Sequence, residues 1–348
     1  MIHASHRRTS KMRLLSATTV LAVAMGLAAC TTTAPGGGAD QGAGNDSKVI
    51  VVIPKATGDP FFGAVKQGAE EAAAELGYTI KFDGPTTADA AGQVTTIENS
   101  TQAKPAAITI APNDPDAVAP ALKAAAAAGI LVSTYNAESA KDARSFFINQ
   151  AVDEAIAEAI VDTMADQVDS KGTFLLVTST ATAANQKTWL DLMQKYLPTA
   201  YPDMKIDQVI PGNDDAATVL SVTATYLAAH PDTTGVWVIG GGMSGAIKAE
   251  QQVGIDPLKV PVAGLCIPSD VRELVHAGTI KNCVLWSPID TGYADVYAID
   301  AWIKGTFPEN GNGTISAGRL GDLDVKDYVV TSGGAQVFTD ENIDDFQF

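Results

Sequence analysis

Cysteine is scarce in this sequence, with three in 348 residues. Cys30 closes an N-terminal segment that we expect to be a targeting signal, so only Cys266 and Cys283 remain for the folded part. Two cysteines are too few for a disulfide framework, and we interpret both as buried apolar side chains. The fold must then depend on its hydrophobic core, and about 300 residues are enough for two domains of ordinary size.

Basic residues are also few, because 23 Lys and Arg stand against 40 Asp and Glu and give a formal net charge of −17. Four basic residues and no acidic one precede Cys30, so removal of that segment changes the charge from −17 to −21. This balance argues against a nucleic-acid partner, which needs basic patches. It suits an exported protein that stays soluble near an anionic surface.

Long apolar runs are absent except at Leu14 to Ala29, which follows the basic residues Arg7, Arg8, Lys11 and Arg13. The run ends in Leu27-Ala28-Ala29-Cys30, which resembles a bacterial lipobox. The resemblance implies a signal peptide over 1–29, lipidation of Cys30, and a mature protein tethered to the outer face of the cytoplasmic membrane. An uncleaved anchor helix is the alternative, but about sixteen residues are short for a span of roughly twenty. No second run approaches that length, so a transport role would need a separate channel.

Residues 30–47 are rich in glycine and have no aliphatic side chain larger than alanine, so we expect a flexible linker. From Lys48 on, strand-like runs alternate with helical ones. The predicted strands are Lys48–Pro54, Thr79–Phe82, Ala106–Ala111, Ile130–Tyr135, Ser145–Ile148, Thr173–Thr178, Lys205–Val209, Gly235–Ile239, Val260–Leu265 and Lys281–Trp286. Two series of βα repeats predict an α/β fold of two doubly wound domains with parallel sheets.

Catalytic motifs are missing: HExxH, GxSxG and Walker patterns do not occur, and the four histidines offer no nucleophile and base pair. Gly240 to Gly245 formally match GxGxxG, but the next predicted strand ends in Leu265-Cys266-Ile267 without the acid that a nicotinamide site needs. We therefore predict a protein that is not an enzyme, with no cofactor and no metal. The glycines more simply let the backbone approach a ligand, or turn.

Polar and aromatic residues gather instead where the predicted strands end, which is where open α/β sheets bind ligands. The candidates are Lys55, Asp59, Phe61, Phe62, Asn136, Asn185, Gln186, Gly241, Cys266 and Trp286. Amides satisfy vicinal hydroxyl groups and aromatic rings cover the apolar side of a sugar or polyol. Simpler roles remain open, since one of the paired phenylalanines could belong to the helix core, Trp286 could cap the sheet, and either asparagine could only form a turn.

The segment IPKATGDPFFGAVKQGAEEAAAELGY, after the lipobox and the linker, resembles the sugar-type periplasmic binding proteins of ABC importers. The stretches SFFINQA, NCVLWSPIDTGYADVYAIDAW and VFTDENIDDFQF are similar to the branch of autoinducer-2 and rhamnose receptors. The resemblance implies two Rossmann-like lobes joined by three hinge strands, a type I periplasmic binding protein. The lobes would be 48–148 plus 287–323 and 149–286 plus 324–348, with the chain crossing between them near Phe147–Asn149, near Trp286–Pro288 and around Asp322–Asp327.

By the same resemblance, Lys55 and Trp286 match ligand-holding residues of the autoinducer-2 receptor, and Phe61 and Phe62 match the sugar-stacking pair of the family. Asn136 and Asn185 stand where that receptor has aspartates, and a neutral amide argues for a neutral ligand. We therefore expect a monomeric solute-binding lipoprotein that delivers a small neutral sugar or sugar alcohol (tetritol, pentitol, pentose or deoxyhexose) to an ABC permease. An autoinducer-2-type signal receptor or a chemoreceptor-coupled sensor is the alternative.

Overall fold

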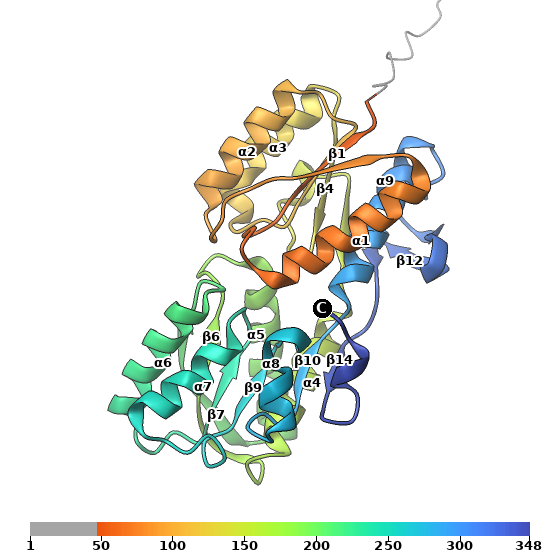
Figure 1. The fold of residues 1–348 in the computed structure, drawn as a ribbon. Coiled ribbons are helices and arrows are strands. Elements are labelled where there is room, and N and C mark those ends of the chain that lie inside the picture. Colours follow the sequence, from red (N-terminus) through yellow and green to blue (C-terminus); the bar gives the residue numbers. More distant parts are fainter. Residues whose placement is uncertain (1–46) are drawn as a thin grey trace, which may run out of the picture. The chain divides into compact units, whose positions relative to one another are not determined.

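The computed structural model describes residues 47–348, which form two α/β lobes, each built on its own β-sheet (Figure 1). The predicted signal peptide, Cys30 and the linker up to residue 46 lie outside the described residues. Within 47–348 no helix is both long and apolar enough to cross a membrane.

The larger sheet has eight strands in the order β11-β12-β13-β5-β4-β3-β1-β2. Six of them run parallel, and β11 and β12 add an antiparallel edge. The strands are β1 Val49–Ile53, β2 Thr79–Phe82, β3 Ala107–Ile110, β4 Leu131–Tyr135, β5 Phe146–Asn149, β11 Gly313–Ser316, β12 Asp322–Lys326 and β13 Val329–Thr331.

Helices cover both faces of this sheet, because successive side chains of a buried strand point to opposite sides. Ile50 and Val52 of β1 join one core, while Val51 and Ile53 join the other. The first core lies under α1 (Pro60–Leu76) and α9 (Pro288–Ile303), and the second under α2 (Ala90–Gln102) and α3 (Pro115–Ala127) (Figure 1). Helices α1 and α9 approach closely, since a Cβ on Gly68 would lie 1.8 Å from the carbonyl oxygen of Ile289.

The smaller sheet has four parallel strands in the order β7-β6-β8-β9. They are β6 Lys171–Thr178, β7 Asp203–Pro211, β8 Gly235–Val238 and β9 Val262–Gly264. Its helices are α4 Asp153–Ala165, α5 Ala184–Ala200, α6 Ala216–Ala229, α7 Met243–Val253 and α8 Pro268–His276. Beside it, β10 (Cys283–Leu285) and β14 (Gln336–Phe338) form an antiparallel pair. Three short 3-10 helices complete the described elements: η1 Lys141–Ala143, η2 Gly318–Leu320 and η3 Ile343–Asp345.

The chain passes between the two sheets three times: after β5, after β10, and between Thr331 of β13 and Gln336 of β14. The first two passages lie where the resemblance implies hinge strands. The third was expected around Asp322–Asp327, but Asp322–Lys326 is β12 of the larger sheet. The chain first adds a hairpin to the edge of that sheet and only then leaves it.

The predicted strands up to residue 286 are present, with ends that differ by at most two residues. Two further features of the fold had not been predicted. The sheets are not purely parallel, because β11, β12 and the β10–β14 pair are antiparallel. Helix α9 had not been recognised from the pattern, since eleven of its sixteen residues are buried and it lacks a clear polar stripe.

Candidate functional site

One cavity lies at the carboxyl ends of the parallel strands and has a volume of about 570 Å³, including space open to solvent. The structure brings all ten predicted site residues to its wall: Lys55, Asp59, Phe61, Phe62, Asn136, Asn185, Gln186, Gly241, Cys266 and Trp286. Five of them come from the larger sheet and its loops, and five from the loops of the smaller sheet and from the end of β10. The cavity is therefore shared between the two sheets.

Lys55 leaves the end of β1 and is only 2 % exposed. Its Nζ donates to Asn185 Oδ1 at 3.0 Å and to Gln186 Oε1 at 3.2 Å. Burial lowers the pKa of Lys55, although the carboxylates of Asp214 and Asp59 act in the opposite direction. Both acceptors come from the first turn of α5, so the ammonium group links the two halves of the cavity.

A buried polar network holds the backbone under Lys55. The side-chain amide of Gln93 donates to the carbonyls of Pro54 and Ala111, and its oxygen accepts from the backbone N–H of Asn113 at 2.9 Å. Asn113 in turn donates from Nδ2 to the Lys55 carbonyl at 2.9 Å. The loops after β1 and β3 are thus fixed to each other, which preorganises the ammonium group.

Asn136 follows β4 in the left-handed region, with φ of 60°. Asparagine tolerates this conformation better than most residues. Asn136 Oδ1 accepts from Asn185 Nδ2 at 3.4 Å, a long hydrogen bond that extends the row of amides beside Lys55. Both asparagines therefore keep capacity to bond a further polar group.

Four aromatic rings also line the cavity: Phe61, Phe62, Trp189 and Trp286. The Trp286 ring lies 5.9 Å from Phe61 and 5.4 Å from Trp189, centroid to centroid. Asp153 Oδ1 accepts the indole N–H of Trp189 at 2.7 Å. The indole N–H of Trp286, by contrast, is buried without a partner among the described residues. A buried donor of this kind is costly unless another group accepts from it.

Asp59 caps α1 and accepts from the backbone N–H of Phe61 at 2.9 Å. Burial, with the nearby carboxylate of Asp214, raises the pKa of Asp59 to about 7. Asp214 accepts from the N–H of Gly241 at 2.7 Å and from the hydroxyl of Ser179. A Cβ on Gly240 would lie 2.7 Å from Asp214 Oδ1, so the glycine loop lets this carboxylate approach.

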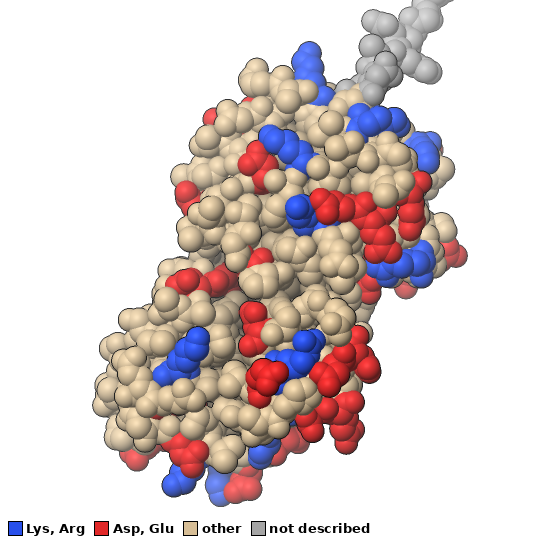
Figure 2. Space-filling view, in the orientation of Figure 1, with Lys and Arg blue, Asp and Glu red and all other residues tan. Residues whose placement is uncertain are grey.

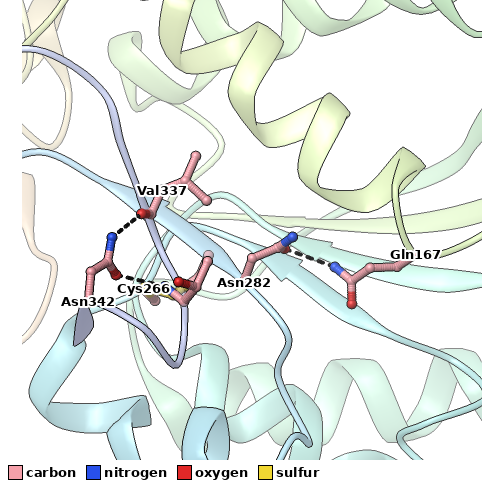
Figure 3. Close-up of a disulfide and its surroundings, with 7 residues drawn as sticks. Gln167, Cys266, Asn282, Val337 and Asn342 are labelled. Atoms are coloured by element: carbon pink, nitrogen blue, oxygen red, sulfur yellow. Dashed lines mark hydrogen bonds between the residues drawn. A yellow bond between two sulfur atoms is a disulfide. The ribbon is translucent and has the colours of Figure 1, made fainter. Parts of the chain in front are cut away.

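Cys266 and Cys283 form a disulfide, with their Cα atoms 5.8 Å apart (Figure 3). Both are buried, as expected from the sequence, but the bond between them was not predicted. The two residues are 17 positions apart, but Cys266 follows β9 and Cys283 begins β10, and a β-bridge between Leu265 and Val284 places these segments side by side. Spacing alone does not reveal this neighbourhood.

Several cavity residues had not been predicted, among them Trp189, Asp214, Ser244, Asp270, Leu265 and Leu285. Asp214 lies in the loop after β7. Ligands bind at the carboxyl ends of parallel strands, so the strand predicted at Lys205–Val209 could have indicated it. Trp189 has the pattern of a buried helix residue, and nothing in the sequence distinguishes it as a cavity residue. Residues 47–348 contain no group of three or more His, Cys, Asp or Glu side chains that could hold a metal ion.

Two α/β lobes, three passages between them and a shared cavity at the strand ends define the type I periplasmic binding fold. The periplasmic binding protein domain family matches residues 50–306. The ribose import binding protein RbsB of Escherichia coli K12 is 25 % identical over 259 residues, which are 74 % of this chain and 85 % of the relative.

Two solved structures share the fold closely. A solute-binding protein of an ABC transporter from Clostridium phytofermentas with bound L-rhamnose is 26 % identical, with a TM-score of 0.81 over 86 % of this chain and 98 % of that one. LsrB from Clostridium saccharobutylicum in complex with AI-2 is 24 % identical, with a TM-score of 0.81 over 86 % of this chain and 100 % of that one. The chain belongs to the periplasmic binding protein family, as the sequence resemblance indicates.

Proposed function

We propose that the protein is an extracytoplasmic solute-binding lipoprotein of an ABC importer, and that it binds a small neutral sugar or sugar alcohol in the cavity between the lobes. The observation that carries the proposal is the lining of this cavity, which combines a row of amides and one ammonium group with four aromatic rings.

This combination of polar and aromatic side chains suits a polyol. The amides of Asn136, Asn185 and Gln186 both donate and accept, so they bond hydroxyl groups that do the same. The rings of Phe61 and Trp286 cover C–H faces, and the free indole N–H of Trp286 gives an oxygen acceptor on the ligand a defined place. The carboxyl oxygens of Asp59 and Asp214 accept hydrogen bonds from hydroxyl groups, and the Asp214 carboxylate repels an anion. Tetritols, pentitols, pentoses and deoxyhexoses fit these requirements.

The relatives support the same ligand class, since one is a ribose importer component and another was solved with L-rhamnose. A sugar importer needs membrane subunits, so we include an ABC permease as partner. We also include a lipid anchor at Cys30 after removal of residues 1–29, and a monomeric mature protein. The permease would bind the lobes in the closed arrangement.

Closure follows from the division of the site between two lobes. We propose lobes of 48–148 plus 287–331 and of 149–286 plus 336–348, with the three passages as hinges. Hydrogen bonds that span the lobes, from Lys55 to Asn185 and from the hydroxyl groups of Thr180 and Thr182 to the Asn113 carbonyl, favour closure. A ligand that contacts both lobes binds the closed form better and shifts the population toward it.

The test is a thermal-shift screen of erythritol, ribitol, D-ribose, D-arabinose, L-rhamnose and AI-2, because a ligand that binds only the native state raises the Tm. We expect at least one sugar or polyol to raise it. Asn136→Ala should abolish the shift, whereas Asn310→Ala, in an exposed loop that does not line the cavity, should keep it. A shift with AI-2 alone would support a signal receptor and contradict our ligand class. If Asn136→Ala still binds the ligand, the assignment of Asn136 to the binding site is wrong.

A further inference from the structure

The disulfide joins two parts of the cavity wall. Cys266 is itself a wall residue, and Cys283 begins the strand that carries Leu285 and Trp286 to the cavity. The loop closed by the bond contains α8 and the wall residues Ile267, Asp270 and Val271. The disulfide therefore joins the two ends of segment 266–283, whose first residues line the cavity.

Backbone pairing at this place is sparse. Strands β9 and β10 have three residues each, and the strand partner of β10 is the three-residue β14. The direct connection between the two cysteine segments is one β-bridge and the hydrogen bond from the Cys266 N–H to the Val284 carbonyl at 3.1 Å. Beside it, Gln167 donates to Asn282 at 2.9 Å (Figure 3).

Helix α8 rests mainly on the C-terminal segment. Arg272 contacts the Phe346 carbonyl and pairs with Asp344, and His276 pairs with Asp340 and Asp344. Figure 2 shows acidic side chains gathered over this C-terminal segment. These contacts hold the middle and the far end of α8, and the Ser269 N–H in its first turn donates to the Phe348 carbonyl at 2.8 Å. The disulfide adds a covalent link two residues before α8 begins, at the end that meets the cavity.

We propose that the Cys266–Cys283 disulfide is a positioning element of the ligand site, which fixes the start of α8 relative to Trp286. This inference rests on the proposed function for its effect on binding. A bond needed only for overall stability would loosen the lobe as a whole when removed. A positioning bond loosens residues 265–271 and 283–287 and leaves β6 and β8 protected.

The first test needs no ligand and compares backbone hydrogen exchange in three proteins: the native protein, Cys266→Ala/Cys283→Ala and Val236→Ala. Val236 is buried in β8 away from the cavity, so its truncation lowers stability without touching the disulfide. We expect exchange to rise at least tenfold in 265–271 and 283–287 of the double variant, with β6 unchanged. Unchanged exchange there, or the same general rise as in Val236→Ala, overturns the proposal.

The second test measures binding of erythritol, D-ribose and L-rhamnose by calorimetry, at a temperature where all three proteins are folded. We expect the double variant to bind at least tenfold more weakly than native protein, and Val236→Ala to bind within about twofold of it. Equal affinity of double variant and native protein refutes positioning. If the native protein binds no sugar or polyol, the proposed function fails, and the exchange experiment still decides the role of the disulfide.

Discussion

The two walls of the cavity are built in different ways. We define the N-terminal wall as Lys55, Asp59, Phe61, Phe62 and Asn136, and the C-terminal wall as the remaining lining residues. Four residues of the N-terminal wall come from one loop and the helix after it, and the buried side chains of Gln93 and Asn113 fix that loop. The C-terminal wall is collected from the ends of β6, β7, β8, β9 and β10.

This difference decides how each wall keeps its shape. The N-terminal wall depends on one network of buried side-chain amides, in which Gln93 and Asn113 each bond the backbone. The C-terminal wall depends on separate contacts of several kinds: the Asp214 bond to Gly241, the disulfide, and the ring contact between Trp189 and Trp286. A substitution in the first wall should act on one group, whereas one in the second should act through neighbours.

The largest effect is expected from Lys55→Met, which keeps the length of the side chain and removes the ammonium group that bonds Asn185 and Gln186. Charged hydrogen bonds contribute about 1.5 to 3 kcal/mol each, so affinity for the bound sugar should fall on the order of 100-fold. Calorimetric titration measures this. Lys66→Met, on the exposed side of α1, is the control and should bind normally. Less than a threefold loss in Lys55→Met would show that the two walls do not depend on this link.

The lobes should also differ in how their stability falls as pH rises from about 4 to 8. Burial raises the pKa of Glu250 in α7 to about 8, and both its carboxyl oxygens lack partners among the described residues. Burial raises the pKa of Asp295 in α9 to about 7, and this carboxyl accepts from Ser133. Both groups bind protons more tightly folded than unfolded. The stability they allow is present in full below the unfolded pKa values, near 4, and is lost as pH rises through the folded values.

Between those limits each group lowers the free energy of unfolding by up to about 1.4 kcal/mol per pH unit. Glu250→Gln should make the free energy of unfolding decrease less steeply with pH up to about pH 8. Asp295→Asn should do the same only up to about pH 7. Urea unfolding at pH 5, 6, 7 and 8 measures both. If Glu250→Gln shows the same loss between pH 7 and 8 as the native protein, the buried carboxyl is not responsible for it.

Much of the N-terminal wall was predictable because its residues are contiguous and follow one clear strand. The strand-end rule also found Asn185, Gln186, Gly241, Cys266 and Trp286 as separate candidates. It does not show that β9 and β10 are neighbours, since strand order depends on the whole fold, and so the disulfide was missed. Helix α9 was missed because it is buried on most sides, and periodicity distinguishes poorly between a buried helix and other apolar segments.

A smaller effect is expected from Trp286→Phe, which keeps a ring and removes the indole N–H that has no partner. If that N–H donates to the ligand, affinity should fall roughly tenfold, the value of one neutral hydrogen bond of about 1 kcal/mol or slightly more. Trp302→Phe, in the cluster with Phe146 and Phe307, is the matched control. Unchanged affinity in Trp286→Phe would mean that the C-terminal wall contributes ring contacts but no donor at this position.

The smallest effect concerns the outer support of the C-terminal wall. Hydrogen bonds to Asp340 and Asp344 raise the pKa of His276, so the protonated imidazole holds the C-terminal segment against α8. This stabilisation is complete below the ordinary pKa of histidine and is lost as pH rises through the raised value. His276→Gln should therefore lower the Tm at pH 6 by about 1 or 2 °C and have less effect at pH 9. His230→Gln, at the end of α6, is the control. An equal decrease at both pH values would show that the contact depends on the shape of the ring rather than its charge, and the exposed ion pairs would then contribute nothing to the position of α8.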